Sequence, residues 1–331
     1  MAVIAVNYRS PEDTIECLAS LFSGERVPYV IVADNASGDG SLETIAAWAK
    51  GERETRYASE FHRNEATAAI RFPIECDLRG PDDLDRPIEK PLTLIDTGAN
   101  LGFAGGNNRG LQVAAGNPAV ELLWLLNNDT TVGPETVGMV IDAFGAHPEW
   151  GMAGTPVRLY HEPHTHQLVN GMRFNKLTGT GRGIGAGSAV DTKLDPDAVA
   201  RQTDFVCGAS LIMSREFFED VGYLEERFFL FYEEIDLATR GKQYPIGFIP
   251  DAVVYHKEGA SAGSSSRLQA RSPLAEYHHI RSKMLFVRKH YPLLLPLYFA
   301  QNLVIVARRL MRRQPPQAKA TARATFGLPL R

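Results

Sequence analysis

Two clusters of carboxylates have the residue types and the surroundings that chemistry needs, and the first is built around Asp129. This residue follows Leu122–Leu126, where five apolar residues in a row predict a strand buried on both faces of a parallel sheet. Because ligands bind at the carboxyl ends of strands in open α/β sheets, Asp129 is a candidate metal ligand, with Asn127 and Asn128 beside it. The same residues also suit a turn and cap before a helix expected from about Pro134 to Phe144.

The second cluster opens another predicted helix, where Glu233, Glu234 and Asp236 follow the aromatic run Phe228–Tyr232. An apolar environment raises the pKa of a carboxyl group and lets it act as a base near neutral pH. Acidic residues also favour the positive end of a helix, so stabilisation of the helix start is the alternative explanation.

Histidines are the remaining candidate ligands. His256 ends the apolar run Ala252–Tyr255 and is therefore expected at a strand end, although a lone histidine more often has a structural role. His161, His164 and His166 lie within residues 160–203, which are rich in Gly, Thr and His and are predicted to form a hairpin or long loop over the cleft. No second set of ligands has a compatible spacing, so these three are predicted to be surface histidines.

The elements that must position these residues follow an α/β pattern. Val3–Val6 and Tyr29–Ala33 are predicted strands, separated by an amphipathic helix over Pro11–Phe22. A right-handed crossover makes the two strands parallel neighbours, and the second ends in the polar stretch Asp34–Ser41. Further strands are expected at Leu92–Asp96, Gly151–Val157, Asp204–Met213, Ile246–Pro250 and Ala252–His256, and helices around Ile45–Trp48 and over Arg215–Val221.

Glycines gather in Gly98–Asn108, after the third strand. They allow backbone amides to approach a ligand closely, and a helix from about Asn107 to Ala115 would direct its positive end to the same place. A dinucleotide-binding site would instead have its glycines after the first strand. Residues 51–91 are charged and Pro-rich and are predicted to be a surface insertion.

Composition is that of a soluble globular protein, with 44% apolar and 22% charged residues. Cys17, Cys76 and Cys207 are scattered, which favours a reducing compartment over a disulfide framework. The apolar N-terminal run is too short for a secretory signal core, so a cytoplasmic location is expected.

Charge separates a body, residues 1–276, from a tail, residues 277–331. The tail carries 11 Lys and Arg and no acid, leaving 24 basic and 39 acidic residues in the body, a balance of −15 against +11. So acidic a body is not expected to bind nucleic acid. Basic residues flank the apolar segment Tyr291–Ala307, which falls short of a spanning helix and suits an interfacial helix on an anionic inner membrane leaflet. The alternative is a helix packed on the body or on a second subunit, as in a homodimer.

Seven blocks in a fixed order resemble the family 2 glycosyltransferases, most closely their rhamnosyltransferase-like branch. The resemblance covers roughly residues 2–290, interrupted by residues 51–91. The blocks are Asn7-Tyr8, Asp34–Ser37, Asn100–Asn107, Leu126–Asp129, Asp204–Ala209, Glu233–Asp236 and His256.

The resemblance implies a GT-A fold, in which a mostly parallel Rossmann-like sheet binds a nucleotide-diphosphate sugar. Asp34 would then contact the base or ribose, and Asp129 and His256 would hold Mg²⁺ or Mn²⁺. Glu234 stands where the family usually has a catalytic Asp, with Glu233 and Asp236 as possible helpers. The nucleotide-sugar pocket would include Asn7, Tyr8, Asn35, Asn100, Gly102, Phe103, Gly105, Asn127 and Asn128, and the acceptor or sugar pocket Cys207, Gly208 and Ala209.

The implied activity is an inverting, metal-dependent transfer in bacterial cell-surface polysaccharide synthesis. The branch suggests dTDP-rhamnose as donor and a saccharide or lipid-linked acceptor, which places the enzyme in the cytoplasm or peripherally on the inner membrane face. A UDP-sugar donor, with galactofuranose, glucose or GlcNAc, is the alternative within the enzymes. A non-catalytic nucleotide-sugar-binding scaffold is the alternative outside them, and a nucleotidyltransferase is disfavoured because no activated-phosphate loop with a catalytic Lys or Arg is recognisable.

Overall fold

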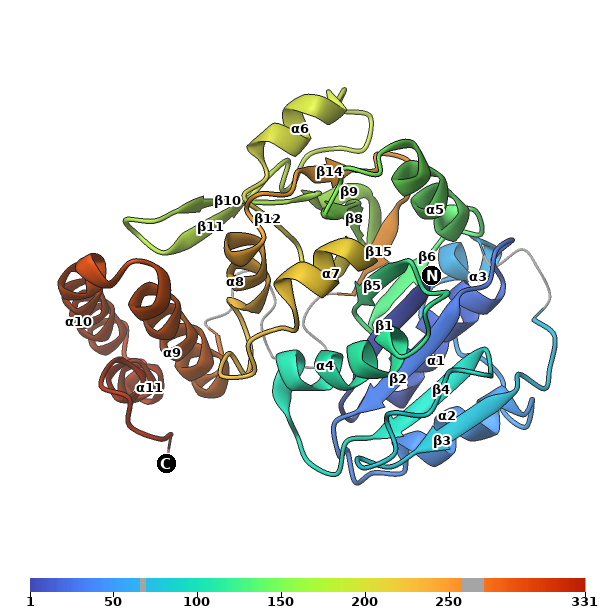
Figure 1. Ribbon diagram of the computed structural model, residues 1–331. Coiled ribbons are helices and arrows are strands. Elements are labelled where there is room, and N and C mark those ends of the chain that lie inside the picture. Colours follow the sequence, from blue (N-terminus) through green and yellow to red (C-terminus); the bar gives the residue numbers. More distant parts are fainter. Residues whose placement is uncertain (66–69, 258–270, 331) are drawn as a thin grey trace.

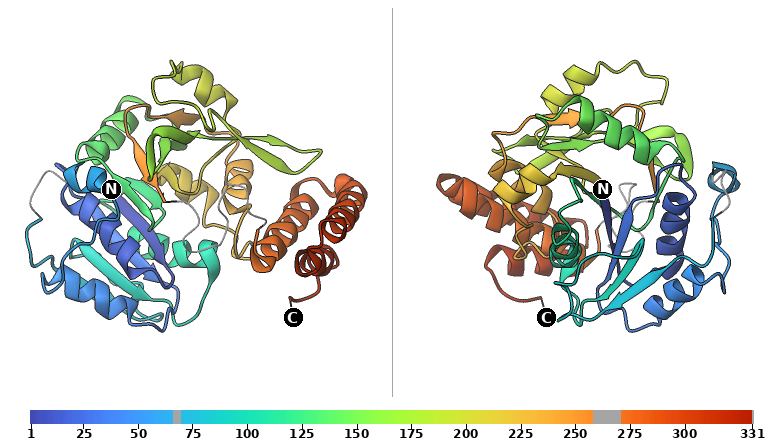
Figure 2. Two further views of the ribbon diagram at one scale, coloured as in Figure 1. Left: turned by 180° about the vertical axis from the view of Figure 1, so that it is seen from behind. Right: turned by 45° about the vertical axis from the view of Figure 1, so that its right-hand side comes forward.

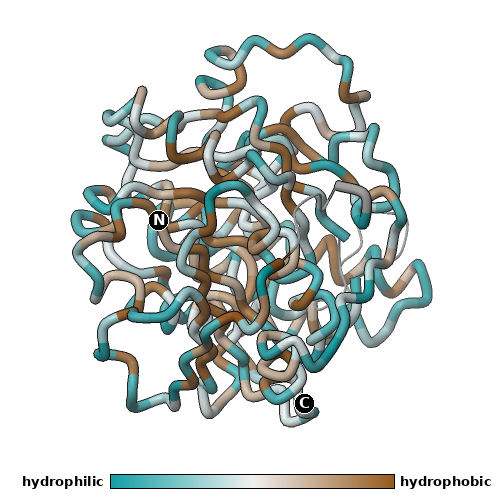
Figure 3. Tube along the Cα trace, turned by 90° about the vertical axis from the view of Figure 1, so that its right-hand side faces the viewer, coloured by the Kyte–Doolittle hydropathy of each residue, from teal (hydrophilic) through white to brown (hydrophobic). Residues whose placement is uncertain are grey.

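A computed structural model describes residues 1–65, 70–257 and 271–330, which form an α/β body and a helical tail (Figure 1). The body is organised around one sheet of eight strands, and the hydropathy-coloured trace shows apolar residues gathered along its centre (Figure 3). The predicted α/β class with a mostly parallel central sheet is confirmed. In spatial order the strands are β14 (Ile246–Phe248), β7 (Met152–Gly154), β13 (Ser210–Ser214), β5 (Leu122–Leu126), β1 (Ala2–Asn7), β2 (Tyr29–Asp34), β4 (Leu92–Asp96) and β3 (Cys76–Arg79).

The strand β5 lies near the middle of this sheet and is buried along its whole length. Leu122, Trp124 and Leu126 pack into the core on one face, whereas Leu123 and Leu125 pack into the core on the other. This alternation is the period of two expected for a strand covered on both sides. The two-sided burial predicted for this strand is therefore confirmed.

Helices cover both faces of the sheet (Figure 1). One core contains side chains of α1 (Pro11–Phe22), α2 (Ser41–Ala49) and α5 (Thr136–Ala146). The opposite core contains side chains of α4 (Gly102–Ala115), α7 (Arg215–Val221), α8 (Glu233–Arg240) and α9 (Pro273–His290). The predicted bounds of α1 and α7 are confirmed to the residue.

The direction of β13 matters for the site. The strand runs antiparallel to β5, with Ser210 opposite Leu126. Its amino end therefore lies where β1, β2 and β5 have their carboxyl ends, and the residues just before β13 reach the same edge of the sheet.

The glycine-rich stretch differs from the expected loop, because α4 already begins at Gly102, five residues before the predicted start. Within this helix, a methyl group on Gly106 would meet Val6, and one on Gly110 would overlap Ile4. The glycines thus serve close packing of α4 on β1.

Residues 51–91 also differ from the expected surface insertion. The strand β3 pairs with β4 and extends the central sheet, and α3 (Glu60–Glu65) brings the buried ring of His62 onto Tyr160, with ring centroids 3.8 Å apart. The strand was missed because it is an edge strand without an apolar run, with Leu78 exposed.

Two smaller sheets lie beside the central one. The first contains β6 (Thr130–Val132), β15 (Val254–His256), β8 (Pro156–Leu159) and β9 (Glu162–Val169), in that order. The second contains β11 (Thr180–Gly183), β10 (Gly171–Asn175) and β12 (Phe205–Val206), and α6 (Pro196–Gln202) lies between β11 and β12 in the chain. The hairpin predicted within residues 160–203 is confirmed, but His166 is buried rather than on the surface.

The tail forms α9, a short 3₁₀ turn over Pro292–Leu294, α10 (Leu295–Met311) and α11 (Pro315–Thr325), gathered at one end of the molecule (Figure 2). Through Phe286 and Ser282, α9 packs on the body. By contrast, α10 buries only Tyr298 and Asn302. The stretch Pro292–Met311 has 20 residues and a mean hydropathy of 1.3, so by length and composition alone it could cross a membrane.

Candidate active site

A buried polar network joins the carboxyl ends of β1, β2 and β5. The side-chain amide of Asn7 donates to Asp34 at 2.5 Å, and the hydroxyl of Ser37 donates to the same carboxylate oxygen at 2.6 Å. Asn128 donates to Thr14 at 2.9 Å, and Thr14 in turn donates to Asn7 at 2.8 Å. The network fixes Asp34 at the sheet edge, where the sequence predicted a nucleotide contact.

The start of α4 is tied to this network and to the segment before α8. The amide of Asn35 donates to the carbonyl of Gly102 at 2.8 Å. Gly102 has a φ of +70° and packs so tightly on Phe229 that a side chain there would overlap the carbonyl of Phe229. The backbone N–H of Phe103 donates to that same carbonyl at 2.8 Å. The start of α4 and the segment before α8, more than a hundred residues apart in the chain, are thereby held together.

Three predicted pocket residues lie at the margin of this arrangement. The exposed Asn100 accepts a hydrogen bond from the backbone of Gly102 at 3.0 Å. Tyr8 is half-buried beside Arg9, whose guanidinium lies 5.2 Å from the Tyr8 ring centre. Gly105 packs against Leu101 inside α4.

The predicted metal ligands face each other. Oδ1 of Asp129 lies 3.1 Å from Nε2 of His256, and both side chains are buried. Burial opposes ionisation of Asp129, but the charge and hydrogen bond of His256 outweigh it and lower the pKa of Asp129 below its ordinary value. Nδ1 of His256 donates to Gln167 at 2.8 Å. That bond leaves Nε2 free to act as a ligand when the imidazole is neutral.

This pair fits a divalent ion by its donors. A carboxylate oxygen and an imidazole nitrogen are suitable ligands for Mn²⁺, and Mg²⁺ accepts one or two protein ligands when phosphate oxygens and water supply the rest. Adjacent ligands of an octahedral ion about 2.1 Å away lie about 3 Å apart, close to the separation of Oδ1 and Nε2. Within residues 1–65, 70–257 and 271–330, no group of three or more Asp, Glu, His or Cys residues is arranged to hold a metal.

Glu233 and Glu234 form a carboxyl pair at the start of α8. Burial, and then the charge of Glu234, raise the pKa of Glu233 well above its ordinary value. Burial also raises the pKa of Glu234, although hydrogen bonds from its own backbone, from Glu233 and from the backbone of Gly208 favour its ionised form. The pair therefore holds one proton on Glu233 and presents Glu234 as the carboxylate.

The residues before β13 bring the two chemical clusters together. The carboxylate of Glu234 lies directly against Gly208. The neighbouring carbonyl of Ala209 accepts a hydrogen bond from the backbone of Asn127 at 3.1 Å, and Asn127 also lies 3.3 Å from Nε2 of His256. The half-buried Cys207 completes this segment. The candidate base and the candidate metal pair thus share one edge of the sheet.

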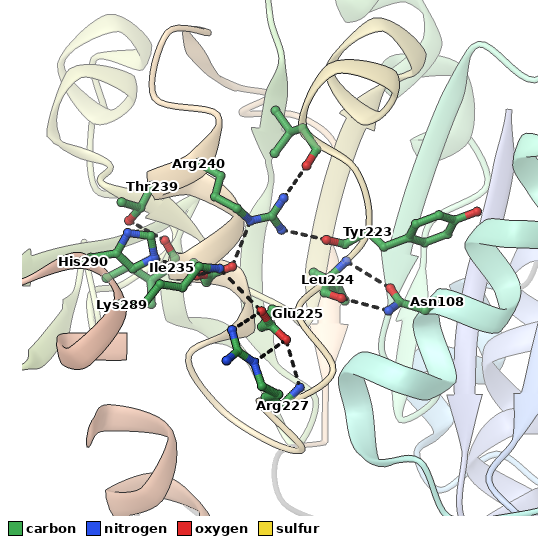
Figure 4. Close-up of polar contacts among 12 residues, drawn as sticks. Asn108, Tyr223, Leu224, Glu225, Arg227, Ile235, Thr239, Arg240, Lys289 and His290 are labelled. Atoms are coloured by element: carbon green, nitrogen blue, oxygen red, sulfur yellow. Dashed lines mark hydrogen bonds and ion pairs between the residues drawn. The ribbon is translucent and has the colours of Figure 1, made fainter. Parts of the chain in front are cut away.

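Asp236 points to the tail rather than to this edge. Its fully buried carboxylate pairs with Arg240 at 2.9 Å, Lys289 at 2.7 Å and His290 at 2.7 Å. These three partners are labelled in Figure 4. Burial opposes its ionisation, but these partners outweigh burial and lower its pKa. The structure thus gives Asp236 a role in joining α8 to α9.

A pocket of about 900 Å³ lies on the far side of this ion-pair cluster. None of the predicted site residues lines it among the residues that the structure describes. Its lining comes from Asp85, from α4 and its end, from the segment before α8, and from Arg240 and Lys289 (Figure 4). The lining residues are Asp85, Asn108, Arg109, Gln112, Ala115, Gly116, Tyr223, Leu224, Glu225, Glu226, Arg240 and Lys289.

Several residues of the site were missed from sequence. Thr14, Ser37 and Gln167 bond directly to predicted residues, and Lys257, which pairs with Asp13 at 2.5 Å and Glu16 at 2.6 Å, follows His256. Ser37 belonged to a recognised block and could have been found there. A threonine inside a helix and a glutamine inside a strand carry no signal of this kind, because their partners come from distant parts of the chain.

Replacing Gly208 by Ala tests the contact between Glu234 and the residues before β13. The added methyl group would overlap the Glu234 carboxylate, so we expect a loss of turnover of about tenfold or more, with nucleotide affinity unchanged. Gly145→Ala is the matched control, because no atom lies within 4 Å of its added methyl group. Full turnover in Gly208→Ala would argue against a catalytic position for Glu234.

Known proteins resemble this chain in sequence and in fold. The N-acetylglucosaminyl-diphospho-decaprenol L-rhamnosyltransferase of Mycobacterium tuberculosis is 26% identical over 298 residues, which cover 84% of this chain and 81% of that protein. The low-salt glycan biosynthesis hexosyltransferase Agl10 of Haloferax volcanii is 25% identical over 247 residues, which cover 73% of this chain and 62% of that protein. No protein-family model matches the chain.

Among solved structures, GalNAc-T7 with UDP, GalNAc and Mn²⁺ superposes with a TM-score of 0.50 over 85% of this chain and 47% of that one, at 10% identity. The chain has the GT-A glycosyltransferase fold. Together with the named relatives, this fold confirms the resemblance to glycosyltransferases and to a rhamnosyltransferase among them. The relatives support a glycosyltransferase activity for this GT-A chain.

Proposed function

We propose that the chain is an inverting glycosyltransferase that moves rhamnose from dTDP-rhamnose to a saccharide or lipid-linked acceptor in bacterial cell-surface polysaccharide synthesis. The observation that carries the proposal is the placement of Glu234 against Gly208, beside the Asp129–His256 pair, at one edge of the sheet. The relative from Mycobacterium tuberculosis, named as a rhamnosyltransferase, supports this donor sugar.

Donor binding is assigned to the polar network at the ends of β1, β2 and β5. Asp34, held by Asn7 and Ser37, would contact the base or ribose of the nucleotide. The start of α4 would face the diphosphate through the partial positive charge of the helix end, since the first two N–H groups, of Gly102 and Phe103, are already paired with Asn100 and Phe229. Contacts of this kind hold the nucleotide sugar in a fixed orientation before reaction.

A divalent ion, Mg²⁺ or Mn²⁺, would be held by Asp129 and His256. When bound, such an ion neutralises negative charge that develops on the departing diphosphate. Gln167 keeps the His256 ring in the orientation that offers Nε2. The Mn²⁺ bound with UDP in GalNAc-T7, which has the same fold, supports this assignment.

Glu234 would accept the proton of the acceptor hydroxyl as that oxygen attacks the anomeric carbon. Glu233, which holds the proton of the carboxyl pair, donates a hydrogen bond to Glu234 and keeps it ionised. Attack from the side opposite the leaving diphosphate is a single displacement, so the product has the inverted anomeric configuration. General base catalysis of this kind contributes about 10²–10⁴-fold to the rate.

The nucleotide is tested by the melting temperature of the protein with dTDP, UDP or GDP, each with and without Mn²⁺ or Mg²⁺. A ligand at about 100 times its dissociation constant adds about 2.7 kcal/mol to the free energy of unfolding. We expect the largest, metal-dependent rise with dTDP. A larger rise with UDP would indicate a UDP-sugar as donor in place of dTDP-rhamnose. The absence of a rise with any nucleotide would favour a non-catalytic role.

A further inference from the structure

A second pocket, of about 470 Å³, lies between the tail and the hairpin formed by β10 and β11. Its walls come from α9, from α10 and from the turn before β11. They include the basic residues Arg271, His279, Lys283, Arg308, Arg309 and Arg312.

The charge of this pocket is almost entirely positive. Glu276 is the one acid among its lining residues, and Arg309 already binds it through two contacts of 3.1 and 2.9 Å. Among the other basic residues of the described lining, burial lowers the pKa of His279 well below its ordinary value and favours its neutral form. The cations Arg271, Lys283, Arg308 and Arg312 have no carboxylate besides Glu276 in that lining. A pocket with this excess of positive charge favours binding of an anion.

Lys283 is the sharpest sign of a missing ligand. Its side chain is only 4% exposed, yet within residues 1–65, 70–257 and 271–330 it has no ion pair, and its amine lies 5.6 Å from the ring centre of Tyr298. Burial lowers the pKa of Lys283 to about 8. Nearby, Nδ1 of His279 has no hydrogen-bond partner among the described residues. A buried cation without a partner costs stability, which an anion would restore.

The pocket lies directly behind the start of α8. The ring of Tyr232 lies 5.6 Å from that of His279, and its hydroxyl donates to the carbonyl of Gly179, another lining residue, at 2.5 Å. Tyr232 immediately precedes Glu233 and Glu234. An anion in the pocket would therefore lie close to Tyr232, two residues before the proposed base.

An apolar surface adjoins this pocket on α10. Val304 and Ile305 line the pocket, and Leu303, Val304, Leu310 and Met311 on the same helix are exposed, at 54, 54, 55 and 76%. Arg308 lies between Val304 and Leu310 along the helix, and Arg312 directly follows Met311. Exposed apolar side chains interleaved with arginines are typical of helices that lie in the interface of an anionic membrane.

We propose that this pocket binds the diphosphate of a lipid-linked acceptor while the exposed apolar face of α10 contacts the lipid. The inference rests on the proposed function, because it assigns a site to the acceptor of that transfer. The diphosphate would bind the basic residues of the pocket, and the hydrocarbon chain of the lipid would lie against the apolar face of α10. The acceptor sugar would then extend towards Glu234.

The test is cosedimentation of the full chain with phosphatidylcholine vesicles that contain a polyprenyl diphosphate. Vesicles with enough phosphatidylglycerol to carry equal negative charge serve as the comparison, and soluble pyrophosphate is added as a competitor. The variants are Lys283→Met and Arg308→Gln, which remove pocket charges. Arg288→Gln is the matched control, since Arg288 is exposed on the same helix as Lys283 but does not line the pocket.

We expect the wild type to prefer the diphosphate vesicles, and each pocket variant to lose about tenfold in affinity for them while Arg288→Gln does not. Lys283→Met should at the same time melt no lower than the wild type, because it removes an unpaired buried charge. A simple structural role for Lys283 would instead lower the melting temperature.

Equal binding to both kinds of vesicle, or equal losses in Arg288→Gln and Arg308→Gln, would overturn the proposal in favour of a general attraction to anionic surfaces. Full release from the diphosphate vesicles by soluble pyrophosphate at no more than the concentration of the lipid diphosphate would overturn the lipid source of the anion, because the lipid chain would then add nothing to the affinity. Nucleotide-induced melting shifts, measured on the same variants, separate this inference from the proposed function. If those shifts and sugar transfer persist without selective vesicle binding, only the pocket assignment fails.

Discussion

Glu234→Gln is expected to lower kcat by about 10²–10⁴-fold while the affinity for the nucleotide sugar stays the same. The substitution keeps the size of the side chain and its place against Gly208, but the amide cannot accept a proton from the acceptor hydroxyl. The rate of transfer is measured by the release of nucleoside diphosphate, and donor binding is measured by the shift in melting temperature. Equal losses of transfer and donor binding would argue against Glu234 as the base.

Glu233→Gln is the matched control for this prediction. Because burial and the charge of Glu234 raise the pKa of Glu233 well above its ordinary value, Glu233 is already neutral and donates to Glu234. A glutamine reproduces a neutral donor of the same length, so we expect it to keep most of the activity. If Glu233→Gln were the inactive variant and Glu234→Gln the active one, the two assignments would be exchanged.

The pH dependence of kcat should report the same carboxylate. Burial raises the pKa of Glu234 above its ordinary value of 4.5. Since a base works only when ionised, activity is expected to fall as the pH drops through this raised pKa, with a midpoint above 4.5. The residual activity of Glu234→Gln should lack that acid limb.

Asp236→Asn is expected to lower the free energy of unfolding by about 3–5 kcal/mol. The change leaves Lys289, His290 and Arg240 facing a buried amide in place of the carboxylate that binds all three (Figure 4). Urea unfolding near neutral pH measures the loss. Glu225→Gln is the control, because Glu225 lies nearby in an exposed pair with Arg227 and a longer contact of 3.7 Å with Lys289, and should cost about 1 kcal/mol or less.

The stability difference between Asp236→Asn and wild type should also depend on pH. The pKa of Asp236 is lowered in the folded protein, so its contribution is fully present above its ordinary value of 3.8 and is lost as the pH falls through the lowered pKa. The difference is therefore expected to be large above about pH 5 and to shrink in stronger acid. A difference that grew in acid would contradict this role.

The central features of the fold could be predicted from the sequence where local pattern and final packing agree. Leu122–Leu126 is apolar at every position because both faces of β5 are covered, and α1 begins at Pro11, which suits the first helical position. The resemblance in seven blocks placed the polar residues at strand ends, and the structure brings Asn7, Asp34 and Asn128 into one network.

What the sequence could not provide depends on distant contacts. The early start of α4 follows from its packing on Val6 and Ile4, which glycine periodicity does not predict. The edge strand β3 forms because β4 offers it free backbone groups, although Cys76–Arg79 has no strand-like pattern. The sequence suggests Asp236 as a catalytic helper because it adjoins Glu233 and Glu234. Its partners Lys289 and His290 lie more than fifty residues along the chain, so its structural role could not be predicted locally.

The reversal of β13 has an evolutionary consequence. The residues proposed to bind the donor lie at the ends of parallel strands, whereas Cys207–Ala209 enter from a strand that runs the other way and is preceded by residues 160–203. Within that stretch, the hairpin of β10 and β11 and the helix α6 belong to a separate small sheet and its connection, so they can be lengthened without shifting β1, β2 or β5, whereas Gln167 on β9 must stay to orient His256. We expect relatives to diversify in the acceptors they use by replacing this module, while their nucleotide chemistry is inherited unchanged.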